Sequence, residues 1–147
     1  MNRKDATQKI VDAKVAKGLT WGEIAAAGDH SESWIVTALL GQATMDRSEA
    51  EKMGKLLELD DEVVQALTQI PHRGDVMQMP PTDPGLYRLY EMLLVYGPTI
   101  KELILEKVGE GIMSAIDFQF DLEKQEDPRG DRIILTMNGK FLPYRKW

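Results

Sequence analysis

The stretch 112-IMSAIDFQFDLE-123 decides the fold class, because the hydrophobic period changes here from that of a helix to that of a strand. Apolar residues recur at the even positions, whereas Asp117, Gln119, Asp121 and Glu123 occupy odd ones. This alternation predicts a half-buried strand with one apolar side. The even positions are Ile112, Ser114, Ile116, Phe118, Phe120 and Leu122, so Ser114 is the polar exception on that side.

The residues that follow predict more strands. Residues 124–131, KQEDPRGD, form a turn-like cluster, and 132-RIILTM-137 has the composition of a second strand. Asn138-Gly139 is a hairpin signal that leads to 140-KFLPYRKW-147. We therefore expect a three-stranded antiparallel sheet.

The residues before the strand predict two helices and a linker. Residues 84–96 form one apolar helix, and Pro98 is expected to stop it and to begin a second helix over 98–109. Residues 71–84, PHRGDVMQMPPTDP, contain four prolines and a glycine, which is typical of a linker.

The first half of the chain predicts five helices, over 5–17, 20–27, 32–41, 46–59 and 61–70. Gly18 ends the first of them, Thr20 and Glu23 form a capping-box pattern, and Ser31 is a plausible N-cap. The fold class is therefore α+β, with an N-terminal all-helical domain over 1–75, a linker over 76–84 and a small C-terminal α+β domain over 85–147. A domain as small as the second buries little surface, so we expect other subunits to complete it.

Composition narrows the class of protein. The net charge is −6, and both halves are acidic, which argues against nucleic-acid binding. No apolar run approaches the length of a membrane span, no secretory signal is visible, and cysteine is absent. We therefore expect a cytoplasmic protein that binds neither nucleic acid nor membrane.

Three polar residues are candidates for a site. Arg88 and Glu91 lie three residues apart on the helix over 84–96, where they can form an ion pair. Most such pairs are exposed and contribute little to stability. This helix, however, is apolar nearly all round, and a charge on such a helix must be paired or functional. Ser114 is either a tolerated small polar residue or a hydroxyl directed at a ligand.

Two other kinds of site are less well supported. The only histidines, His30 and His72, lack a carboxylate at metal-ligand spacing, so we expect no metal site. The two helices around Gly28 resemble a helix-turn-helix, and a DNA-binding regulator is the alternative function. Its reading helix would begin 30-HSESW-34, which offers no Arg, Lys, Asn or Gln to the bases.

Several segments together resemble the cyanase family, also called cyanate hydratase or cyanate lyase. These are 82-TDPGLYRLYEMLLVYG-97, 106-EKVGEGIMSAIDF-118 and 137-MNGKFLPYRKW-147, and the similarity also covers 38-ALLGQ-42 and 69-QIPHRG-74. The most specific element is Y-R-x-Y-E, followed 23 residues after its Glu by the Ser of G-I-x-S-A-I. The resemblance spans nearly the whole chain.

The resemblance implies an enzyme, a lyase that decomposes cyanate to ammonia and carbon dioxide in a bicarbonate-dependent reaction. It implies Arg88, Glu91 and Ser114 as the catalytic residues, with no metal or organic cofactor. It also implies a repressor-like N-terminal domain without DNA binding, an intertwined C-terminal dimerisation domain, and a homodecamer of five dimers. Glu91 either orients Arg88 or carries a proton, and the biological purpose is either detoxification or nitrogen metabolism.

Overall fold

The computed structural model describes residues 1–74 and 79–146. The chain divides into two compact units, Met1–Asp75 and Val76–Trp147. The predicted linker over 76–84 lies partly outside the described residues; of its described part, residues 79–83 contain no helix or strand, and Pro84 begins a helix.

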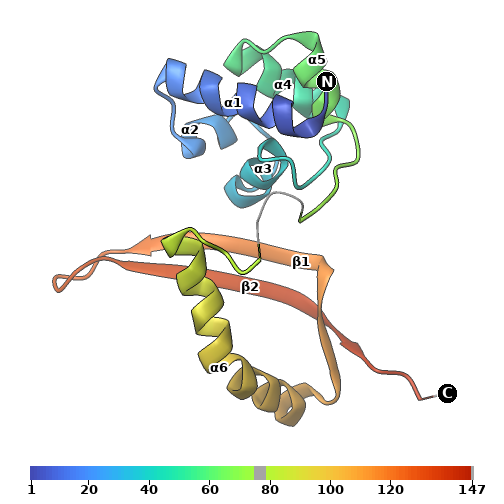
Figure 1. Ribbon diagram of the computed structural model, residues 1–147, viewed down its shortest axis with the longest axis vertical. Helices are drawn as coiled ribbons and strands as arrows, with labels where there is room; N and C mark the ends of the chain where they lie inside the picture. The colour runs from blue at the N-terminus through green and yellow to red at the C-terminus, as the bar shows by residue number, and fades with distance from the viewer. Residues whose placement is uncertain (75–78, 147) are drawn as a thin grey trace. The chain divides into compact units, whose positions relative to one another are not determined.

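Five helices lie within residues 1–74 (Figure 1), as the sequence predicts: α1 (Arg3–Lys17), α2 (Trp21–Ala25), α3 (Glu32–Leu39), α4 (Arg47–Leu57) and α5 (Asp61–Leu67). The capping box of α2 is formed: Thr20 Oγ1 accepts from the Glu23 amide at 3.2 Å, and Glu23 accepts from the Thr20 amide at 2.7 Å. Gly18 ends α1 in the left-handed conformation, with φ 65°. Local signals therefore place these helix ends.

The apolar core belongs to the first unit. It is formed by side chains from all five helices, including Ile10, Ile24, Ile35, Leu39, Met53 and Leu67, and every buried member of the cluster lies between Ala6 and Leu67. Arg3 adds a polar contact, because its guanidinium donates to the carbonyls of Ala38, Ala43 and Ala66 at 2.7–2.9 Å. This contact joins the start of α1 to the ends of α3 and α5.

In the second unit, one long helix replaces the two that were predicted. Helix α6 (Pro84–Val108) begins after the N-cap Asp83 and continues through Pro98. The prediction of a helix end at Pro98 was wrong. A proline inside a helix removes one backbone hydrogen bond and bends the axis, but it does not have to end the helix.

The strands form a single hairpin rather than a three-stranded sheet. Strand β1 (Gly111–Gln125) pairs antiparallel with β2 (Arg132–Pro143), and the chain reverses at 126–131. The predicted turn at Asn138-Gly139 was wrong, because both residues lie inside β2, opposite Gln119 and Phe118. Gly139 is absent from the glycines with positive φ that a type I′ turn would require.

A bulge interrupts β1 at Ser114. Met113 faces Phe141 and Phe118 faces Gly139, so four residues of β1, 114 to 117, lie opposite Lys140 alone. The three extra residues are an odd number, and the side-chain alternation therefore reverses across the bulge. The prediction that the even positions from 112 to 122 share one face was wrong for this reason: Phe118 shares a face with Met113, not with Ile112.

The apolar face of the hairpin consists of Met113, Phe118, Phe120, Leu122, Ile133, Leu135, Met137 and Phe141. No residue of α6 is buried, and much of α6 stands clear of the hairpin in Figure 1. Within residues 79–146, Ser114 and Pro81 are the only buried residues.

None of the described helices is both long enough and apolar enough to cross a membrane.

Candidate functional site

Arg88 and Glu91 form the predicted ion pair in the first half of α6. Arg88 Nε lies 3.0 Å from Glu91 Oε2, and the two side chains are 71% and 48% exposed. An exposed pair three residues apart adds little to stability, because water screens both charges. The guanidinium keeps donors free for an anion, since it has five N–H groups in a planar fork.

Ser114 lies at the start of the bulge in β1 and is only 5% exposed. Its Oγ accepts hydrogen bonds from the amides of Ile116, at 3.0 Å, and of Asp117, at 2.9 Å. A serine hydroxyl has two lone pairs and one proton, so these contacts occupy its acceptor capacity and leave the proton to donate. The bulge thus makes Ser114 a fixed hydrogen-bond donor.

The structure brings together two of the three predicted residues. Arg88 and Glu91 touch, whereas within one chain no hydrogen bond or ion pair among the described residues joins either of them to Ser114. Tyr87 and Tyr90 lie beside the ion pair, with ring centroids 6.1 Å apart. The aromatic rings and the charged pair therefore occupy one stretch of α6, apart from the serine on β1.

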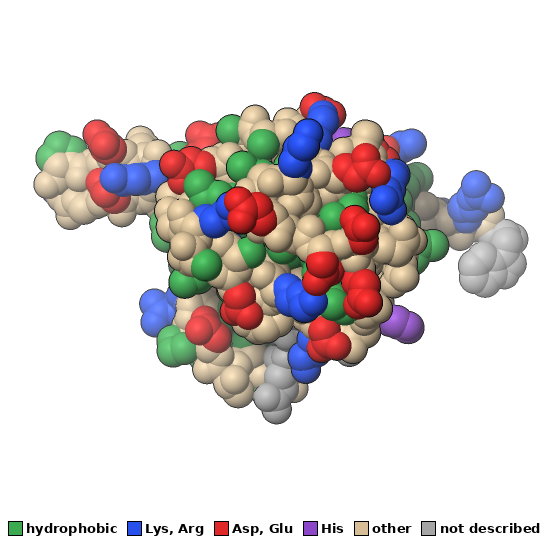
Figure 2. Space-filling model, turned by 90° about the horizontal axis from the view of Figure 1, so that it is seen from above, with side chains coloured by type: hydrophobic (Ala, Val, Ile, Leu, Met, Phe, Trp, Pro, Cys, Tyr) green, Lys and Arg blue, Asp and Glu red, His purple; other side chains and the backbone are tan. Residues whose placement is uncertain are grey.

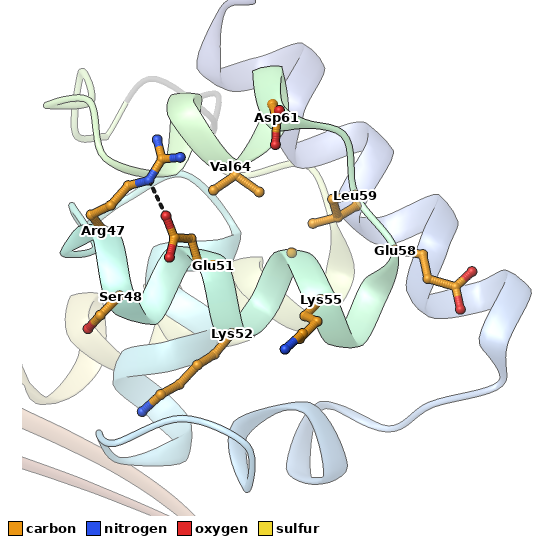
Figure 3. A pocket seen from close by; sticks show the side chains of 10 residues that line it. Arg47, Ser48, Glu51, Lys52, Lys55, Glu58, Leu59, Asp61 and Val64 are labelled. Carbon is orange, nitrogen blue, oxygen red and sulfur yellow. Dashed lines mark hydrogen bonds and ion pairs between the residues drawn. The ribbon is translucent and has the colours of Figure 1, made fainter.

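A surface groove of about 780 Å³ lies elsewhere, along α4 and the start of α5 (Figure 3). Its cations are matched in number by anions: Arg47 Nε contacts Glu51 Oε1 at 2.6 Å, and the lining also includes Lys52, Lys55, Glu58 and Asp61. Such a groove offers no surplus positive charge to an anion, and it contains none of the predicted site residues.

Comparison with known proteins assigns both units to one family. The family model described as cyanate lyase C-terminal domain matches residues 78–146, and the one described as cyanate hydratase, N-terminal, matches residues 3–71. The chain belongs to the cyanate hydratase family. It is therefore related to enzymes along its whole length, as the sequence resemblance implied.

Individual relatives agree with the assignment to the cyanate hydratase family. Proteins named cyanate hydratase from Dechloromonas aromatica and Variovorax paradoxus are 48% and 47% identical, and each match covers all of both chains. The crystal structure of cyanase from T. urticae superposes with a TM-score of 0.83 at 38% identity, covering 94% of this chain and 96% of that one. The match supports the α+β fold class.

The helix-turn-helix region of this cyanate hydratase family member lacks the charge pattern of a DNA reader. On the face seen in Figure 2, acidic and basic side chains are interspersed rather than gathered into a basic surface. Helix α3 carries no Arg, Lys, Asn or Gln, and its first turn contains Glu32, which would face phosphates in a helix-turn-helix complex.

Sequence reasoning missed Glu49, whose side chain is 1% exposed. Glu49 Oε1 accepts from the Asp29 amide at 3.0 Å, and Oε2 lies 2.7 Å from His30 Nδ1. The carboxylate therefore fastens the turn between α2 and α3 to α4. The available signal was the helical spacing of Glu49 and Met53, which places the carboxylate on the buried side of α4.

His30, one of the two histidines of the chain, has a side chain that is 45% exposed. The ring also stacks on Trp34, with centroids 4.1 Å apart, while its Nδ1 faces Glu49. Across residues 1–74 and 79–146, no group of three or more His, Asp or Glu side chains is arranged to hold a metal ion.

Proposed function

We propose that this protein decomposes cyanate to ammonia and carbon dioxide in a reaction that requires bicarbonate. The full-length match to proteins named cyanate hydratase carries the proposal. The exposed arginine on α6 and the serine in the bulge add the two kinds of donor that a pair of small anions needs.

Arg88 is proposed as the anion-binding residue. Its planar fork suits the oxygens of bicarbonate or cyanate, and Glu91 at 3.0 Å orients it. Ser114 is proposed to donate its remaining proton to cyanate or to the charge that develops in the transition state. Tyr87 and Tyr90 frame the pocket rather than react.

The chemistry requires positioning more than covalent participation by the protein. A bicarbonate oxygen attacks the cyanate carbon and gives a mixed anhydride of carbamic and carbonic acid. Loss of carbon dioxide from the anhydride leaves carbamate, whose C–N bond then breaks to give ammonia and a second carbon dioxide. With the uptake of two protons overall, one cyanate and one bicarbonate yield one ammonia and two carbon dioxides. We propose that the reaction uses neither a metal nor an organic cofactor.

We propose that the site is completed between subunits of a homodecamer built from five dimers. The support is twofold: among the described residues, no hydrogen bond or ion pair joins Arg88 to Ser114 within one chain, and the apolar surface of the second unit is uncovered. An interface that brings α6 of one chain to the bulge of another would explain both observations. The decamer itself follows from the family resemblance, whereas the proposed cytoplasmic location follows from the composition of the sequence.

The decisive experiment measures ammonia release from cyanate by the purified protein, with and without added bicarbonate. We expect turnover that depends on bicarbonate and persists in the presence of a chelator. Absence of ammonia release with both anions present would refute the activity, and equal rates without bicarbonate, in buffer freed of carbon dioxide, would refute the co-substrate.

The rival function, a DNA-binding regulator, predicts a different result. A DNA-binding protein loses affinity steeply as salt rises, because it displaces counterions from the phosphates. We expect a fluorescence titration with duplex DNA to show no salt-dependent binding at low micromolar protein concentrations, in agreement with the interspersed charges of Figure 2.

A further inference from the structure

Gly139 lies beside the one residue of β2 that opposes the bulge. It pairs with Phe118, and the next residue, Lys140, faces residues 114–117. A Cβ atom added to Gly139 would lie 2.6 Å from the carbonyl oxygen of Ser114 and would overlap the side chain of Met113. Real Cβ atoms essentially never approach another heavy atom within 3.0 Å, so a substitution here must displace something.

The constraint at Gly139 is space rather than backbone conformation. Its φ is absent from the positive values that favour glycine. Met113 could relieve one overlap, because its side chain is flexible. The overlap with the Ser114 carbonyl involves backbone on both strands, so it is relieved only by a shift between β2 and the bulge.

Movement of the Ser114 carbonyl would also move its hydroxyl. The Oγ atom is held by the amides of Ile116 and Asp117, so the carbonyl and the hydroxyl belong to one hydrogen-bonded loop. The close approach of β2 at Gly139 therefore sets the position of this hydrogen-bonded loop relative to β2.

We propose that Gly139 is a positioning residue for Ser114: its missing side chain lets β2 approach closely enough to fix the bulge and thus the direction of the serine hydroxyl. The inference rests on the proposed role of Ser114 in cyanate decomposition. The Asn138-Gly139 pair, whose composition predicted a turn, would then serve within β2, where the glycine positions the bulge.

The test compares Gly139→Ala with Gly22→Ala, whose added Cβ would meet its nearest neighbour at 3.6 Å. The readout is kcat/KM for cyanate at saturating bicarbonate. We expect Gly139→Ala to lose roughly 10- to 100-fold, as a displacement of about 1 Å at a reacting centre does. Gly22→Ala should stay within twofold of the parent protein.

Two further measurements separate positioning from general damage. Hydrogen exchange should become faster in the peptide containing the Ile116 and Asp117 amides and stay unchanged in the peptide over 126–138. Adding Met113→Ala to Gly139→Ala removes the side-chain overlap but leaves the carbonyl overlap, so it should not restore activity. Full restoration by Met113→Ala, or lost activity with unchanged exchange at the bulge, would overturn the proposal.

The remaining outcomes are also decisive. If neither Gly139→Ala nor the double variant gives soluble protein of the parent mass, Gly139 serves folding and the proposal fails. If Ser114→Ala is fully active, the proposed role of Ser114 fails instead. If Ser114→Ala is impaired while Gly139→Ala is fully active, only the positioning role is refuted.

Discussion

At the scale of single residues, the exposed Arg88 is the side chain on which the proposed chemistry depends most. We expect Arg88→Leu to lower kcat/KM roughly 100- to 1,000-fold, because a charged donor directed at the reacting anions is lost. Arg88→Lys should recover only part of this, because an ammonium lacks the planar fork. The measurement is ammonia release, with the mass checked by light scattering.

Lys101→Leu is the control for Arg88→Leu, since it removes an exposed cation from the same helix. It should leave turnover unchanged. Parent-level activity in Arg88→Leu would show that the anion is bound elsewhere.

Arg3 illustrates a residue whose contribution is to stability. Burial lowers the pKa of its guanidinium, which nevertheless stays charged and satisfies three carbonyls. We expect Arg3→Met to destabilise the first unit by about 2–4 kcal/mol, because carbonyls at the ends of α3 and α5 lose charge-assisted hydrogen bonds.

Denaturant unfolding monitored by the helical circular dichroism signal measures the effect of Arg3→Met. Lys4→Met is the matched control, since Lys4 is exposed on the same turn of α1, and it should change stability by less than about 0.5 kcal/mol. Equal stability of the two variants would contradict a clamping role for Arg3.

At the scale of elements, the helix caps make the first unit sensitive to acid. A backbone hydrogen bond from Glu49 lowers the pKa of the Asp46 cap, and backbone and hydroxyl donors of Thr20 lower the pKa of Glu23. A lowered folded-state pKa contributes stability that is fully present above the unfolded value and is lost as the pH falls through the folded value.

We therefore expect the melting temperature of the first-unit helices to fall as the pH drops below the ordinary pKa values of 4.5 for Glu and 3.8 for Asp. Asp46→Asn keeps the cap but removes the titrating group, so its melting temperature should fall less over the same range. Identical pH profiles for Asp46→Asn and the parent would contradict this account.

The helices of the first unit could be predicted because their ends are set by local signals. Gly18, Thr20 with Glu23, and Ser31 each act within a few residues, and all three appear as expected. Pro98 misled the prediction because a proline inside a helix can bend the axis without ending the helix.

The geometry of the second unit depends on contacts between distant residues, and the sequence pattern could not supply them. The bulge at Ser114 arises from a pairing between residues 113–118 and 139–141, and it reverses the alternation that the pattern assumed. The candidate residues Arg88, Glu91 and Ser114 could be named from spacing and family resemblance. The amides of Ile116 and Asp117, which hold the serine hydroxyl, could not be predicted, because a regular strand would place them elsewhere.

At the scale of the whole molecule, the two units differ in where their apolar surface lies. The first buries its large side chains, whereas Leu135, Met137 and Leu122 on the apolar face of the hairpin are exposed. We expect Leu135→Lys to reduce the assembled mass measured by sedimentation or to make the protein insoluble, because a charge would enter a buried interface.

Thr136→Lys is the control for Leu135→Lys, because Thr136 is the next residue of β2 and faces the other side of the hairpin. It should assemble like the parent. A parent-like mass for Leu135→Lys would show that the apolar face of the hairpin stays uncovered in solution.

The confinement of the buried core to residues 6–67 has a consequence for how the chain renatures. The first unit can close on itself, so its recovery after dilution from denaturant should follow first-order kinetics. In the assembly that we propose, the second unit finds its apolar neighbours in other chains, so its recovery should accelerate with protein concentration. Activity should therefore return later than helicity, and the delay should lengthen as the solution becomes more dilute.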